Sequence, residues 1–145
     1  MKKKRVNLKK IFPKKINLGK RNWGSEILLA LIPKLLTLKM LTLKKGSKGG
    51  LQYHHKKNEC GYLLSGKLKI KYLTKKGILK EKILKSGSVF YIPPGAVHQE
   101  YAITNCKILE ASSSHFNDRV RVEKIFGFKE TKGLKTTKKN EVIHL

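Results

Sequence analysis

The sequence predicts an all-β protein, a single-domain jelly roll, on three observations. Its apolar residues recur in short alternating runs, and no long stretch has the 3.6-residue period of a helix. Glycine and proline separate these runs, and turn sequences such as TKKG and SGK suit hairpins. The length of 145 residues suits one domain with its own core. Two packed antiparallel sheets accommodate these elements best.

Nine strands are predicted between residues 22 and 128, the range that we expect to form the barrel. In chain order they are residues 25–31, 35–43, 50–55, 60–66, 67–74, 78–84, 88–93, 98–104 and 106–112. The segment IPPGAVH places Pro-Pro-Gly at a tight bend directly before His98. Nine short strands are enough to close two sheets against each other.

The two ends of the sequence are rich in lysine and are expected to be extensions of the barrel. Residues 1–21 form the basic N-terminal extension and residues 129–145 the basic C-terminal tail. The apolar run ILLALIPKLL is interrupted by Pro33 and Lys34, well short of the roughly 20 residues that a membrane span needs. Cys60 and Cys106 suggest neither a metal pair nor a disulfide framework. We expect a soluble cytoplasmic protein without a membrane span.

The charge is strongly positive, with 34 Lys and Arg against 9 Asp and Glu and a net charge of +25. Such a balance suggests nucleic acid or an anionic membrane as a partner. However, the basic residues are nearly all lysines spread along the chain, and arginine is the residue that recognises phosphate and guanine bidentately. We therefore interpret the charge as solvated lysine faces and expect no specific nucleic-acid partner, with polyanion binding as the alternative.

The stretch GSKGGLQYHHKKNECGYLLSG, residues 46–66, contains candidate metal ligands. If residues 50–55 form a strand, Gln52 and His54 point to the same face, and Glu59 returns close to His54 after a polar turn. His98, on a separate strand, is the fourth candidate. This mixed nitrogen and oxygen set suits zinc, iron, manganese, nickel or cobalt. Without a metal, each such buried group would cost roughly 1 to 3 kcal/mol, which disfavours the alternative of a simple polar turn.

These residues resemble the two motifs of the cupins. The first motif, G-x5-H-x-H-x4-E-x6-G, matches Gly46, Gln52, His54, Glu59 and Gly66, with the glutamine in place of the first histidine. The second motif, G-x5-P-x-G-x2-H-x3-N, matches Gly87, Pro93, Gly95 and His98, with Ala102 in place of the final asparagine. The resemblance implies a double-stranded β-helix barrel that binds one divalent metal ion through Gln52, His54, Glu59 and His98.

The set Gln, His, Glu, His is that of the phosphomannose isomerases, and residues 22–128 resemble the cupin domain of the type II mannose-6-phosphate isomerases. The segments NWGSE and NDRVRVEKIFG carry this likeness, although Lys124 and Phe126 depart from the family pattern. The resemblance implies aldose–ketose isomerisation of a sugar or sugar phosphate in carbohydrate or polysaccharide metabolism, with zinc as the first choice of metal. It also implies a homodimer, for which the apolar strand at residues 36–43 is the expected edge.

An isomerase needs a base that moves a proton between neighbouring carbons. The candidates are Glu110 on the last strand, Lys39 on an early strand, and a metal-bound hydroxide. Arg121 or Lys39 would hold a phosphate. The alternatives are a cupin module that binds a metal and a small ligand without turnover, and a cupin dioxygenase or lyase, because the fold does not determine the reaction.

Overall fold

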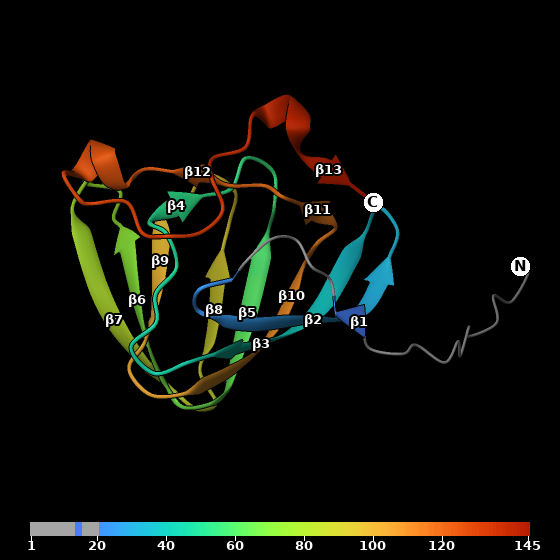
Figure 1. The fold of residues 1–145 in the computed structure, drawn as a ribbon, viewed down its shortest axis with the longest axis horizontal. Helices are drawn as coiled ribbons and strands as arrows, with labels where there is room; N and C mark the ends of the chain where they lie inside the picture. The colour runs from blue at the N-terminus through green and yellow to red at the C-terminus, as the bar shows by residue number, and fades with distance from the viewer. Residues whose placement is uncertain (1–13, 16–20) are drawn as a thin grey trace, which may run out of the picture.

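The computed structural model describes residues 14–15 and 21–145, which form two large packed β-sheets and a small two-stranded sheet (Figure 1). This confirms the all-β jelly roll, and each of the nine predicted segments contains a strand. These nine strands are β2 (Gly24–Ile32), β3 (Leu36–Leu43), β4 (Gln52–Tyr53), β5 (Glu59–Ser65), β6 (Lys67–Leu73), β7 (Leu79–Lys85), β8 (Val89–Ile92), β9 (His98–Ala102) and β10 (Cys106–Ser113). The remaining strands are β1 (Lys14–Lys15), β11 (His115–Phe116), β12 (Val120–Arg121) and β13 (Ile143–His144). None of the helices in the described residues is long and apolar enough to cross a membrane.

The larger sheet has the strand order β1-β2-β3-β10-β5-β8. Its burial alternates along β3 and β10, so that every second side chain faces the interior. In the antiparallel register of these two strands, Lys39 lies opposite Glu110. The expectation that residues 36–43 form a sheet edge is wrong, because β3 pairs with β2 on one side and with β10 on the other.

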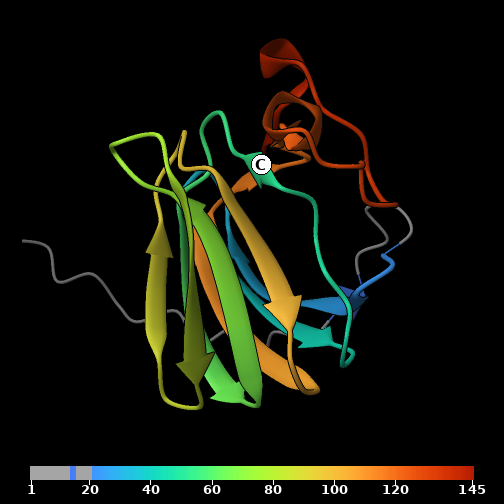
Figure 2. The same ribbon diagram turned by 90° about the vertical axis from the view of Figure 1, so that its left-hand side faces the viewer.

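The smaller sheet has the strand order β12-β4-β9-β6-β7 and packs across the barrel from the larger one (Figure 2). Strand β4 is only two residues long, shorter than the predicted 50–55. Its Gln52 lies in register with His98 of β9 on one side and with Arg121 of β12 on the other. This pairing brings two segments that are distant in sequence next to the predicted metal ligands.

The interior of the barrel is divided between an apolar part and a polar part. The apolar core consists of Leu41, Leu43, Leu63, Leu68, Ile70, Leu84, Ala102, Cys106 and Ile108. Farther along the same strands the inward positions become polar, as at Lys39 on β3, Glu59 on β5 and Glu110 on β10. Burial of the apolar half stabilises the fold through the hydrophobic effect. The polar half contains the buried charged side chains, so the functional site is expected there.

Gly61 marks a point where strand β5 admits no side chain. A Cβ atom at this position would lie 2.2 Å from the nearest ring carbon of Phe90, which is on the adjacent strand β8. Only glycine therefore allows the Phe90 ring to pack over β5 and against the core.

Residues 129–145, expected as a tail, make defined contacts with the barrel. The Thr137 N–H donates to the carbonyl of Arg119 at 2.9 Å, and the Thr137 side chain is buried. After the 3-10 helix η2 (Lys139–Glu141), β13 pairs with β11. The other 3-10 helix, η1 (Glu123–Phe126), ends at Gly127, whose φ of 72° is in the left-handed region.

Candidate metal centre and its cavity

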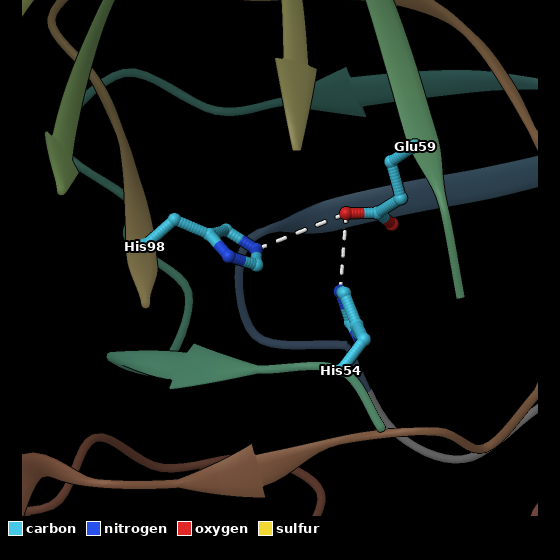
Figure 3. A group of neighbouring side chains, drawn as sticks. All are labelled: His54, Glu59 and His98. Atoms are coloured by element: carbon cyan, nitrogen blue, oxygen red, sulfur yellow. Dashed lines mark hydrogen bonds and ion pairs between the residues drawn. The ribbon is translucent and has the colours of Figure 1, made fainter. Parts of the chain in front are cut away.

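Three of the predicted metal ligands converge inside the polar half of the barrel (Figure 3). His54 follows β4, Glu59 begins β5 and His98 begins β9. Their ligand atoms all lie within 4.8 Å of one another. The Glu59 Oε2 atom is 3.0 Å from Nε2 of His54 and 3.8 Å from Nε2 of His98. The three side chains therefore surround a point where one ion would contact all of them.

The other ring nitrogen of each histidine faces a backbone carbonyl. Nδ1 of His98 lies 2.9 Å from the carbonyl oxygen of Ala96, and Nδ1 of His54 is hydrogen bonded to the carbonyl of Asp118. Because a carbonyl oxygen only accepts, both Nδ1 atoms carry the proton and donate it. In the neutral ring, the lone pair of Nε2 then points toward the Glu59 carboxylate. A lone pair facing a carboxylate requires a proton or a cation between them, and a divalent metal fits that requirement.

The ionisation states of Glu59 and His98 also favour the binding of a cation. Burial raises the pKa of Glu59, but Lys57 and His54 lower it by more, so the pKa lies well below its ordinary value. Burial lowers the pKa of His98, and this exceeds the opposite effect of Glu59. Near neutral pH the site thus presents an ionised carboxylate and a neutral His98 imidazole, the forms that bind a metal.

Asp118 holds the loop between β4 and β5 in place. Its carboxylate accepts hydrogen bonds from the backbone N–H groups of His55, Lys56 and Lys57, at 2.8, 2.7 and 2.8 Å. Burial raises the pKa of Asp118, but these donors lower it by more. Since the carbonyl of the same residue is bonded to His54, Asp118 fixes both the loop and the orientation of a candidate ligand.

Gln52 lines the same cavity, whose volume is about 150 Å³. Its strand position beside His98 places it at the edge of the three-residue group. Gln52 remains a predicted ligand, and the amide oxygen would complete the set of four. All four predicted metal ligands thus share one cavity with the three predicted catalytic residues Lys39, Glu110 and Arg121.

A buried lysine links the candidate metal ligands to Glu110. Lys57 Nζ lies 3.0 Å from Glu110 Oε1 and forms a second ion pair with Oε1 of Glu59. Burial lowers the pKa of Lys57, but Glu110 and Glu59 raise it by more, so the net shift is upward. Lys57 is therefore an ammonium ion. It pairs with Oε1 of Glu59, and Oε2 of the same carboxylate faces His54.

The ion pairs continue across the larger sheet with alternating charge. Lys39 Nζ lies 3.6 Å from Glu110 Oε1 and 2.9 Å from Glu26 Oε1, and the other Glu26 oxygen is 2.9 Å from Arg21. Burial raises the pKa of Glu26, but Lys39 and Arg21 lower it by more. These side chains balance one another, so the row is nearly neutral although the protein carries a large positive charge.

Arg121, predicted as a phosphate-binding residue, is bound within the protein. Its guanidinium pairs with Glu123, and it also donates to the carbonyl of Leu134 at 3.3 Å and to Oγ1 of Thr131 at 2.6 Å. These contacts fasten the segment after η1 to β12. The arrangement favours a structural role for Arg121 over contact with a ligand.

Sequence reasoning missed several charged residues of the cavity, among them Lys57, Glu100 and Arg119. Glu100 follows His98 by two residues on β9, so the alternation of the strand would have indicated that both face inward. Burial, followed by Glu59 and Glu110, raises the pKa of Glu100 to about 8. No pattern distinguishes Lys57 or Arg119 from the many other basic residues of the sequence.

His98 also lines a second, more apolar cavity of about 340 Å³. This cavity lies between the two sheets, and its walls include Ile70 and Tyr72 of β6, Leu84 of β7 and Phe90 of β8. One histidine ring therefore contributes to the walls of both cavities.

Comparison with known proteins agrees with this architecture. The family model described as the cupin domain matches residues 39–111, and the protein belongs to the cupin family. Among curated proteins, none matches the sequence significantly.

Solved structures with the same fold share little sequence. The capsular polysaccharide assembling protein CapF from Staphylococcus aureus is 22% identical with a TM-score of 0.58, over 72% of this chain and 28% of CapF. KdgF from Halomonas sp. is 17% identical with a TM-score of 0.56, over 64% of this chain and 82% of KdgF. An oxalate decarboxylase from Bacillus subtilis is 17% identical with a TM-score of 0.58, over 75% of this chain and 30% of the decarboxylase. This chain spans less than a third of CapF and of the decarboxylase, and these similarities show the fold alone.

Proposed function

We propose that the protein is a metal-binding cupin that converts a sugar or sugar phosphate by aldose–ketose isomerisation. The observation that carries this proposal is the convergence of two Nε2 atoms and one carboxylate on a single point. Charged side chains that could hold and reprotonate a polar substrate surround that point. The resemblance of the sequence to type II mannose-6-phosphate isomerases supplies the reaction class.

In this proposal, Gln52, His54, Glu59 and His98 hold one divalent metal, with zinc as the first choice and iron, manganese, nickel or cobalt as alternatives. When bound, the metal would act as a Lewis acid on the carbonyl and hydroxyl oxygens of the sugar. Four protein ligands leave one or two positions for these oxygens on a five- or six-coordinate ion.

Glu110 is the proposed proton carrier, because it lines the cavity and its carboxylate is paired with Lys57 and Lys39. These two ammonium groups hold the Glu110 carboxylate in place inside the cavity, where it would accept a proton from one sugar carbon and return it to the next. Lys39 positions Glu110 from the adjacent strand. Arg121 holds the wall of the cavity through its contacts with Glu123 and Thr131.

The test combines metal analysis with a reaction screen. Protein purified without chelator is expected to contain close to one metal ion per chain and to interconvert a hexose phosphate with its ketose isomer. Glu110→Gln should keep the metal and lose the conversion, whereas the exposed Glu130→Gln should retain both. Absence of bound metal from the native protein would contradict the proposal.

A second outcome would identify a different function for the same site. CapF, whose printed description names capsular polysaccharide assembly, contains a region of this fold within a much longer chain. If the metal-loaded protein binds hexose phosphates but converts none of them, the site is a ligand-binding module without turnover. Equilibrium dialysis beside the reaction screen separates these two outcomes.

A further inference from the structure

Most of the arginines of this protein line the cavity that contains the candidate metal ligands. Only four of its 34 basic residues are arginine, and three of those four, Arg21, Arg119 and Arg121, line the cavity of the candidate metal centre. Lysines, in contrast, occur over the whole sequence. Arginine binds planar and tetrahedral oxyanions through two parallel hydrogen bonds, which a lysine cannot do.

Two of these three arginines already have carboxylate partners. Arg21 donates to Glu26 Oε2 from Nη2 at 2.9 Å and from Nε at 3.2 Å. Arg121 is paired with Glu123 and bound to Thr131. Their charges are therefore neutralised within the protein.

Arg119 differs from both of them. It donates to the neutral side chain of Asn117 at 2.9 Å, and it forms no ion pair with any carboxylate of residues 14–15 and 21–145. The first 20 residues contain no Asp or Glu that could serve instead. Burial, followed by the neighbouring Arg21, lowers the pKa of Arg119 to about 10, and Glu26 and Asp118 oppose this shift only in part. The guanidinium remains charged at neutral pH, and within the described part of the chain no carboxylate forms an ion pair with it.

A second cation reaches the same cavity from the C-terminal segment. Lys132 lines it together with Gly133 and Leu134, and the contacts of Arg121 with Thr131 and Leu134 hold this segment in place. Lys132 itself is exposed at the surface. A small anion that enters this cavity from solvent would therefore find two cationic side chains in its lining, Lys132 and Arg119.

We propose that Arg119, assisted by Lys132, forms an oxyanion site that binds the phosphate group of a small phosphorylated ligand. This inference rests on the proposed function for the sugar part of that ligand. It transfers the phosphate-binding role from Arg121 and Lys39, which are paired with carboxylates, to a residue that is not. Arg119 directly follows Asp118, whose carbonyl orients His54, so the anion site and the metal site share one backbone segment.

The experiment measures binding of inorganic phosphate to the full-length protein by calorimetry, with and without metal. Arg119→Met keeps most of the aliphatic stem and removes the charge, and it should weaken phosphate binding about tenfold, the effect of one lost charge-assisted bidentate contact. Lys132→Ala should weaken it less. Lys107→Ala, which removes an exposed lysine from β10, is the matched control for net charge and should bind phosphate as the native protein does.

The phosphate affinities of the variants test the oxyanion site, and the metal content tests the proposed function separately. Equal phosphate affinity of Arg119→Met and Lys107→Ala, or no phosphate binding by the native protein, would overturn the oxyanion site. Arg119→Lys provides a second variant that keeps the charge, and it should bind phosphate with intermediate affinity. Melting curves and metal content should be unchanged in all variants. If Arg119 proves necessary for phosphate binding but the native protein holds no metal, the proposed function fails and the oxyanion site stands.

Discussion

Lys57 and Glu110 form a buried ion pair of 3.0 Å, although the lysine follows a short strand of one sheet and the glutamate belongs to the other. Because Lys57 also pairs with Glu59, one ammonium group joins the candidate metal ligands to the candidate proton carrier. The protein thus contains a permanent cation beside the point where we propose that a metal binds.

Replacing Lys57 with Met is expected to destabilise the protein by about 3–5 kcal/mol, because the carboxylates of Glu59 and Glu110 would be left buried without their partner. The free energy of unfolding from urea denaturation of the metal-free protein measures this loss. The double variant Lys57→Met with Glu110→Gln should recover part of it, since one of the two charges is removed. An unchanged free energy of unfolding for Lys57→Met would contradict the assigned pairing.

Replacing His54 or His98 with Ala should abolish stoichiometric metal binding, because each removes one of the three atoms that converge on a single point. Gln52→Ala should leave binding weakened but measurable, since an amide oxygen is a weaker donor than an imidazole. Elemental analysis after dialysis gives the metal content. His144→Ala, at an exposed residue of β13, serves as the control and should bind as the native protein does. Full retention of metal after loss of both His54 and His98 would exclude this centre.

The lowered pKa of Glu26 predicts a specific acid dependence of stability. Because this pKa is below its ordinary value of 4.5, the ionised carboxylate stabilises the fold above that pH. This contribution is lost as the pH falls through the folded-state pKa. Glu26→Gln should therefore be less stable than the native protein at pH 6, and the difference should shrink on acidification. Urea titrations between pH 6 and pH 3 test this, with Glu130→Gln, at an exposed position, as the control. A constant difference across this range would disprove the linkage.

Gly61→Ala should destabilise the protein by about 1–3 kcal/mol, because the added methyl group would collide with the Phe90 ring. Gly49→Ala is the matched control, since a Cβ there meets no atom within 4 Å. Thermal melting compares the two variants. Gly61→Ala combined with Phe90→Leu should regain some stability, and a failure of Gly61→Ala to lower the melting temperature would show that β8 can move away from β5.

We expect a homodimer that uses the outer face of β5 and β8. Tyr62 and Val89 lie opposite each other in these strands, and their exposed fractions are 42% and 64%. Leu64 and Tyr91 extend the same apolar surface. Such contiguous exposed apolar side chains are typical of association sites. Light scattering at micromolar concentration should give twice the chain mass, and Val89→Lys should reduce it. A monomeric native protein would refute this surface as an interface.

The sequence was sufficient for most of the strands because alternation of apolar residues, as in β3 and β10, reports directly which face is buried. It did not indicate β11, β12 and β13, whose two-residue pairings depend on partners far away in the chain. The spacing of Gln52, His54, Glu59 and His98 predicted a shared cavity. Lys57, in contrast, appeared to be part of a polar turn, because its ion-pair partner Glu110 lies more than fifty positions later in the sequence.

His98 lies between two cavities of opposite character, one polar and one more apolar. Its ring is oriented by the hydrogen bond from Nδ1 to the carbonyl of Ala96, and it borders the same apolar cavity as Ile70 and Phe90. A change of side-chain volume at Ile70 or Phe90 would therefore shift the His98 ring relative to His54 and Glu59, without replacing any of the proposed ligands. For the proposed metal site, this arrangement means that residues that are not ligands would contribute to the choice of metal.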